Sequence, residues 1–227
     1  MSALSIFVDE ASNFGPYERH NSYYVLTLVF HDQAISIHRN IAKLNETLVS
    51  TLHVSGKAIH TGPMIRQNDD YSNQSIDERR KQFFKLLAFL RNSDVSYKSF
   101  TFPKKEYDSM QLIGRMSREL SLFIQTNMTF FQSFEQVNVY YDGGQTQVTQ
   151  VLTSVFNALL FDVDFRKVIP SEYYLFQVAD LICTIELLAI KRDNKLLTKS
   201  DTHFFYRPQE LKRIIKEVRV KAYDPSS

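Results

Sequence analysis

The chain has 227 residues, of which 44% are hydrophobic and 23% charged, so one domain with a normally packed core is expected. A net charge of +2 is too small to favour nucleic-acid binding through the bulk field, although local basic patches could still act. The single cysteine, Cys183, excludes an intramolecular disulfide and a zinc site of several cysteines, and no stretch approaches the roughly 18 apolar residues of a membrane span.

Strands and helices alternate along the first half of the chain. Apolar, β-rich runs predict strands at 4–9, 23–30 and 95–102, with a short one at 56–60. Apolar residues at helical spacing predict helices at 33–52 and 75–91, and a long one within 105–131. The polar stretch 60–75 is expected to be a loop. The second strand is expected to return antiparallel to the first.

The second half continues the alternation. Strands are expected at 136–141 and 165–169, and helices at 146–160, 173–190 and 208–220, with a polar loop at 193–206 and a short tail after 221. This order predicts a single α/β domain over 1–227, with one sheet between helices. Because the chain begins with a strand and no signal peptide is apparent, a cytoplasmic protein is expected.

Two acids follow apolar strands directly. Asp9 ends the first strand, and Asp142 ends the strand 136–141, just before two glycines and a helix. Ligands of open α/β sheets bind outside the carboxyl ends of the strands, so parallel neighbouring strands would bring both acids to one edge. The alternatives are that Asp142 is a turn former and that Asp9 bonds to its own loop. Glu10 should point to the other face of its strand, and we rank it below Asp9.

A third acid, Asp180, lies in the otherwise apolar helix 173–190. Gln177, Asp180 and Thr184 share one face of that helix by their spacing, and this face could simply meet water. If Asp180 instead meets Asp9 and Asp142, the three carboxylates would suit a hard divalent cation, which takes oxygen ligands.

Taken together, three segments resemble the domain-of-unknown-function family 3800, of the ribonuclease H-like superfamily. They are Val8-Asp9-Glu10-Ala11-Ser12, Tyr140-Tyr141-Asp142 and Gln177-Val178-Ala179-Asp180-Leu181-Ile182. The last match is the most specific. The first departs from the family pattern at Ala11, where serine is usual. A fourth acid, frequent in related folds, has no counterpart in the segment 57–60.

The resemblance implies a ribonuclease H-like mixed sheet flanked by helices, with helical insertions. It also implies that Asp9, Asp142 and Asp180 bind Mg²⁺ or Mn²⁺ and act on a phosphodiester of nucleic acid. His60 is then the best histidine for proton transfer, against the alternative of a surface histidine. Glu10 is a further catalytic candidate.

Basic residues offer candidate contacts to a nucleic-acid backbone. Lys191 and Arg192 rank first, because they extend the helix that carries Asp180. The leading hypothesis is therefore a metal-dependent nuclease or a related phosphoryl-transfer enzyme. The alternative is a non-catalytic protein of the same fold that binds nucleic acid, a protein partner or a second copy of itself in a mobile-element or defence system.

Two other enzyme classes are disfavoured by the sequence. An aspartyl-phosphate phosphatase would need a second Asp at position 11, which is alanine. A Ser-His-Asp hydrolase would need a Gly-x-Ser-x-Gly elbow, which the chain lacks.

Overall fold

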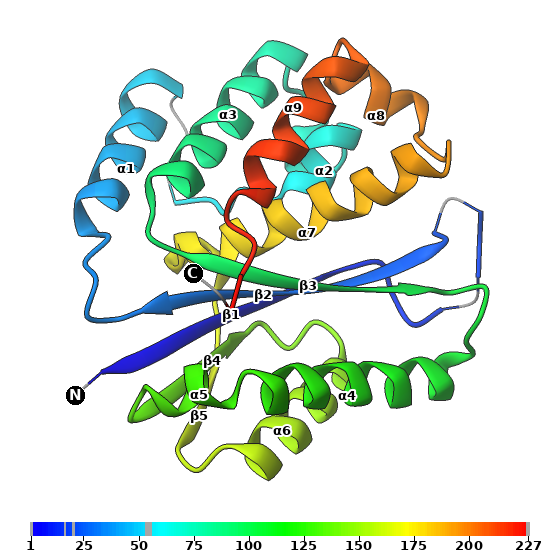
Figure 1. Cartoon of the computed structure of the whole chain (residues 1–227). Coiled ribbons are helices and arrows are strands. Elements are labelled where there is room, and N and C mark those ends of the chain that lie inside the picture. The colour runs from blue at the N-terminus through cyan, green and yellow to red at the C-terminus, as the bar shows by residue number, and fades with distance from the viewer. Residues whose placement is uncertain (1, 16, 20, 53–55, 226–227) are drawn as a thin grey trace.

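The computed structural model describes residues 2–15, 17–19, 21–52 and 56–225, and Figure 1 shows their arrangement. A five-stranded sheet runs through the middle of the molecule, with strand order β3-β2-β1-β4-β5. The strands are β1 (Ala3–Ala11), β2 (Tyr23–Asp32), β3 (Ser96–Pro103), β4 (Gln136–Tyr141) and β5 (Val163–Lys167).

The sheet is mixed. β1 pairs antiparallel with β2, and β2 antiparallel with β3, whereas β1–β4 and β4–β5 are parallel pairs. In the β1–β4 pair Phe7 lies opposite Tyr140, and their rings stack at 4.5 Å between centroids. The predicted mixed sheet flanked by helices is confirmed, and so is the prediction that the strands preceding Asp9 and Asp142 are parallel neighbours.

Helices cover both faces of the sheet (Figure 1). One face, called here the α7 face, is covered by α1 (His38–Leu52), α2 (Thr61–Arg66), α3 (Ile76–Asn92), α7 (Tyr174–Asp193), α8 (Lys199–Phe204) and α9 (Pro208–Arg219). The other face, called the α4 face, is covered by α4 (Ser109–Thr126), α5 (Met128–Gln132) and α6 (Thr146–Leu159). Two short 3-10 turns, η1 (Asp69–Tyr71) and η2 (Pro170–Glu172), complete the elements.

Helix α7 lies directly on β1 and β2. Apolar residues occupy most of its circumference, and thirteen of its twenty residues are buried, which is typical of a helix enclosed within a domain. Asp180 is therefore carried into the interior by its helix, at the level where β1 ends. In the described ranges, no helix combines the length and apolar character that crossing a membrane requires.

The predicted elements were wrong in three connecting regions, 56–60, 60–75 and 193–206. Residues 56–60 form no strand, because the Ile59 N–H donates to the Gln177 side chain of α7 rather than to a neighbouring strand. The predicted loop 60–75 contains α2 and η1, and the buried Arg79 of α3 stabilises the end of α2 by donating to the carbonyl of Met64 at 2.6 Å.

The predicted loop 193–206 contains α8. Its sequence signal is a capping box, in which the Thr198 side chain accepts from Asp201 N–H and Asp201 accepts from Thr198 N–H. The predicted long helix within 105–131 is divided into α4 and α5 at Asn127.

Candidate active site

Asp9 and Asp180 belong to the α7 face, and Asp142 lies in the loop directly after β4. Side chains alternate along a strand, so Asp9 points to the same side as Phe7, whose ring is in the core beneath α7. Asp142 follows Tyr140 by two residues, and Tyr140 belongs to the same core. Asp180 approaches from α7 itself. One turn further along, the Cys183 thiol lies 3.7 Å from the Asp9 carbonyl oxygen, which places this part of α7 over the end of β1.

The carboxyl of Asp9 is strongly perturbed by its surroundings. Burial raises the pKa of its carboxyl well above the usual range, and the negative charges of Asp180, Glu10 and Asp142 raise it further. Among these charged neighbours, Asp180 makes the largest contribution to the raised pKa. The effect requires the acids to be near one another, and it is what a group of carboxylates shows without a neutralising partner.

The carboxylate of Asp180 is held by several donors. The Thr61 backbone N–H donates to Oδ2 at 2.9 Å, and the Thr184 hydroxyl donates to Oδ1 at 3.3 Å. The neighbouring Gln177 accepts from Ile59 N–H at 3.1 Å and donates to the Pro170 carbonyl at 3.0 Å. The segment before α2 is thus held against α7 by the bonds to Gln177 and Asp180. With 14% of its side chain exposed, Asp180 does not face bulk water.

His60 lies at the open side of this group. Its Nδ1 is 3.6 Å from Asp180 Oδ2, and 49% of its side chain is exposed, compared with 14% for Asp180. The neighbouring Asp180 carboxylate raises the pKa of His60, and burial opposes part of that rise. The imidazole is therefore both accessible and inclined to hold a proton.

Asp142 bends back onto its own loop. Its Oδ1 accepts from Gly144 N–H at 2.8 Å, and Gly143 has a φ of +79°, a conformation that favours glycine. A β-carbon at Gly144 would lie 3.2 Å from Asp142 Oδ1, so the second glycine leaves room for the carboxylate. Both the turn-former role and a ligand role for Asp142 remain compatible with this geometry.

Glu10 occupies the α4 face, opposite to Asp9. Its Oε1 accepts from the Tyr141 hydroxyl and from Gln145 Nε2, both at 2.9 Å, while Oε2 is buried without a hydrogen-bond partner in the described structure. Burial raises the pKa of Glu10, and the two hydrogen bonds counteract that rise. Through Tyr141 and Gln145, Glu10 therefore supports the loop of Asp142 from the α4 face of the sheet.

The chemistry of the donor set fits a hard divalent cation, but the side-chain positions do not yet enclose one. Within the described ranges, no three His, Cys, Asp or Glu side chains are arranged so that they could hold a metal ion. Mutual repulsion and hydrogen bonds to local donors keep the carboxylates apart. Asp180 accepts from Thr61 and Thr184, and Asp142 accepts from Gly144. Rotation of these side chains would be needed to bring the oxygens together.

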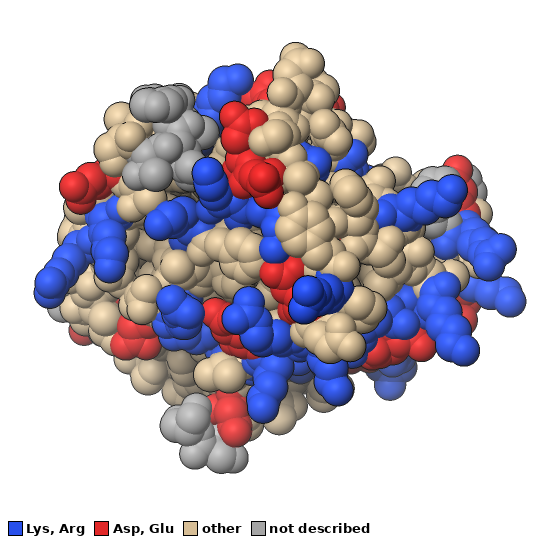
Figure 2. Space-filling model, turned by 90° about the horizontal axis from the view of Figure 1, so that it is seen from above, with Lys and Arg blue, Asp and Glu red and all other residues tan. Residues whose placement is uncertain are grey.

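The two predicted backbone-binding residues lie farther along α7. Lys191 is buried, with 9% exposure, and burial lowers the pKa of its amine while Asp201 opposes that change. Arg192 is paired with Asp193 at 2.7 Å. Figure 2 shows Lys and Arg side chains spread over the molecule from above, with Asp and Glu among them. The contribution of Lys191 and Arg192 to nucleic-acid binding stays a prediction.

Sequence reasoning missed the residues that fix the acids. Thr61 was assigned to a loop, yet its N–H is the closest donor to Asp180, and its buried hydroxyl has no hydrogen-bond partner in the described structure. Tyr141 and Gln145 hold Glu10 and were not singled out. Their polar atoms act across 119 to 135 positions of sequence, and no local pattern reports such contacts.

Comparisons with known proteins leave the family open. No family model matches the chain, and no curated protein does. Among solved structures, the chain is similar to the crystal structure of the ribonuclease H2 from Pyrococcus horikoshii OT3, with 14% identity and a TM-score of 0.43 over 99% of this chain and 91% of that chain. This similarity is too distant to support an activity. The resemblance to family 3800 stays a prediction.

Proposed function

We propose that this protein is a divalent-metal-dependent nuclease, or a closely related phosphoryl-transfer enzyme, of the ribonuclease H-like superfamily. The observation that carries the proposal is that acids from β1, the loop after β4 and α7 approach the same end of the sheet, where the charges of Asp180 and Asp142 act on Asp9. Asp9 lies in β1 just beyond the last pair of its parallel ladder with β4, Asp142 directly follows β4, and α7 brings Asp180 over this end of β1. The raised pKa of Asp9 supports it: burial is the main cause, and a cation would relieve the repulsion from Asp180, Glu10 and Asp142 that raises the pKa further.

In this proposal Asp9, Asp142 and Asp180 hold Mg²⁺ or Mn²⁺. Such an ion, when bound, would neutralise charge on the attacking water and the leaving oxygen of a phosphodiester. The chain's own residues prepare the site. Thr61 N–H and Thr184 orient Asp180, and Glu10 supports the loop that carries Asp142 through Tyr141 and Gln145.

His60 is the proposed proton donor to the leaving group. Its exposed ring lies at the edge of the acid group, and Asp180 raises its pKa, so the ring keeps its proton to a higher pH than a free imidazole does. The substrate class is nucleic acid, with Lys191 and Arg192 as the first candidates for backbone contacts.

The proposal is tested with a panel of labelled DNA, RNA and RNA–DNA hybrid substrates, each with and without millimolar Mg²⁺ or Mn²⁺. Cleavage should require the ion and should fall on the order of 10²-fold or more in Asp9→Asn, Asp142→Asn and Asp180→Asn. The matched control is Asp162→Asn, an exposed acid at the opposite end of the sheet, which should cleave like wild type.

Ion binding has its own readout. Magnesium or manganese should raise the melting temperature of wild type by mass action, and the three variants should lose most of that increase. If neither ion changes the melting temperature and no substrate is cleaved, the catalytic proposal fails. The non-catalytic binding protein would then be the better description.

A further inference from the structure

The outer edge of the sheet at β3 is partly covered by the chain's own C-terminal segment. Tyr97 N–H donates to the Lys221 carbonyl at 3.0 Å, and Tyr223 N–H donates to the Tyr97 carbonyl at 2.8 Å. These bonds form a parallel bridge between Tyr97 and Ala222. The edge of β3 can therefore pair with an added strand. Tyr97, the first residue whose backbone groups face outward, is already paired with the C-terminal segment.

The pairing of the C-terminal segment stops after this single bridge because a proline follows. Outward backbone groups alternate along β3, so the next residue to pair is Ser99. In the same parallel register, the Ser99 carbonyl would need the N–H of residue 225, which is a proline without that hydrogen. The outward groups of Ser99 and Thr101 have no backbone partner among the described residues, and Pro103 ends the strand.

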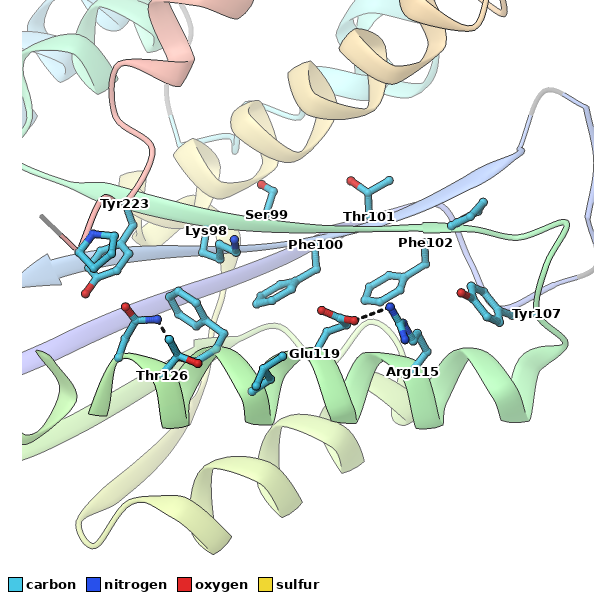
Figure 3. A pocket seen from close by; sticks show the side chains of 15 residues that line it. Lys98, Ser99, Phe100, Thr101, Phe102, Tyr107, Arg115, Glu119, Thr126 and Tyr223 are labelled. Atoms are coloured by element: carbon cyan, nitrogen blue, oxygen red, sulfur yellow. Dashed lines mark hydrogen bonds and ion pairs between the residues drawn. The ribbon is translucent and has the colours of Figure 1, made fainter. Parts of the chain in front are cut away.

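A groove of about 590 Å³ runs beside this open stretch, between β3 and α4. Figure 3 shows Phe100 and Phe102 pointing from β3 toward α4, while Ser99 and Thr101 point to the opposite side. Leu122 of α4 also lines the groove and is 55% exposed. Apolar surface thus lies next to unpaired strand hydrogen-bonding groups, which is the combination that strand addition uses.

The charge of the groove favours an acidic occupant. Arg115 and Glu119 of α4 pair with each other at 2.6 Å. Lys98 has no ion-pair partner among the described residues, and its amine lies over the Phe100 and Phe123 rings, at 5.6 and 5.5 Å from their centroids. Lys98 therefore brings a positive charge to the place where β3 meets the groove, without an ion-pair partner among the residues that the structure describes.

We propose that the Ser99–Thr101 edge and the groove beneath it bind an extended segment of a partner protein. This segment pairs with the outward backbone groups of Ser99 and Thr101, continuing the line begun by 221–223. One of its apolar side chains enters the groove over Phe100 and Phe102, and an acidic side chain meets Lys98. The surface lies at the sheet edge formed by β3, so it is independent of the acid group at the ends of β1 and β4.

The test selects a random peptide library, displayed on phage, against the full chain. Enriched peptides should alternate apolar and acidic residues. Thr101→Pro removes the outward N–H and should weaken their binding about fivefold to tenfold, whereas the matched control Thr101→Ala retains the N–H and should bind like wild type. Lys98→Glu should weaken binding of the acidic peptides. Melting curves check that each variant is folded.

A second variant protects the test against misfolding of Thr101→Pro. Pro225→Ala restores the missing N–H, lets the chain's own tail extend along Ser99, and should also weaken peptide binding. The proposal is overturned if no peptide is enriched, or if the enriched peptides bind all variants equally. It is also overturned if single-stranded oligonucleotides displace the peptides, or if the edge instead mediates concentration-dependent self-association that Thr101→Pro abolishes.

Discussion

The two faces of the sheet are packed with different chemistry. On the α4 face, aromatic rings meet one another: Phe123 lies between Phe30, Phe100 and Phe131, with centroids 5.8–6.0 Å apart. On the α7 face, the apolar core is interrupted by paired polar groups. Apart from Lys104, the buried Lys, Arg, Asp and Glu side chains in the described residues belong to helices of that face.

The candidate site therefore lies on the face with buried polar groups, whereas most of the other face contributes to stability by apolar packing. A buried polar group is costly without a partner, so each one on the α7 face needs a specific neighbour. Glu186 of α7, for example, accepts from the Tyr97 hydroxyl at 2.6 Å and from Arg219 at 2.7 Å. Away from Glu10 and its partners Tyr141 and Gln145, the α4 face is held by apolar packing, so its aromatic residues can be tested without touching the acids.

The largest expected effect is on activity. Asp9→Asn should abolish cleavage, by on the order of 10²-fold or more, and yet raise the melting temperature of metal-free protein. Removing the charge ends the repulsion from Asp180, Glu10 and Asp142. Each kcal/mol gained should raise the melting temperature by about 2–4 °C at this chain length. Calorimetry with chelator measures it, and a lower melting temperature would contradict the described environment of Asp9.

The next effect is on stability alone. Phe123→Ala removes a buried ring from the aromatic group of the α4 face and should reduce the free energy of unfolding by about 3–5 kcal/mol. Urea denaturation measures this change. Because Phe123 lies on the other side of the sheet, the folded variant should retain its affinity for Mg²⁺ or Mn²⁺ and its cleavage rate. Loss of either one in folded protein would break the proposed separation of the faces.

A pair of tyrosines compares hydrogen bonding on the two faces. Tyr97→Phe removes the donor to the buried Glu186 and should cost about 1–3 kcal/mol. Tyr24→Phe is the matched variant, because the buried Tyr24 hydroxyl has no hydrogen-bond partner in the described structure. Its loss should leave the free energy of unfolding unchanged or raise it. Equal costs for both variants would show that Tyr24 has a partner of comparable strength.

The smallest effect is the pH dependence of stability. The pKa of Asp9 is raised in the folded state, so the folded protein binds more protons than the unfolded chain between that pKa and the ordinary value. This contribution to stability is fully present below the unfolded pKa and is lost as pH rises through the folded one, by at most about 1.4 kcal/mol per pH unit. Glu10 contributes with the same sign.

In chelator, the melting temperature should therefore increase as the pH falls through the raised pKa of Asp9 toward its ordinary value, until other carboxylates titrate. Asp9→Asn should flatten this slope, and Asp162→Asn should preserve it. A slope in Asp9→Asn equal to that of wild type would assign the effect to other groups.

Long periodic segments were predictable from the sequence. Strand β4 and helix α6 were located nearly to the residue, because their apolar patterns decide which side is buried. The parallel pairing of β1 and β4 was predicted from two apolar runs that each lead into an acid, although β1 continues past Asp9 to Ala11. The short elements α2 and α8 were missed, since six-residue helices carry little periodic signal and form here through contacts with Arg79 and the cap at Thr198.

For the candidate site, the sequence by itself determined the residue types, their order and the strand ends that carry Asp9 and Asp142. The tertiary structure alone decided that Asp180 faces β1 rather than water, that Glu10 supports the loop from the opposite face, and that Thr61 orients Asp180. The physical reason is range. Hydrophobic periodicity acts over neighbouring turns and residues, whereas these carboxylates are oriented by hydrogen bonds and charges that the folded sheet brings together from distant positions.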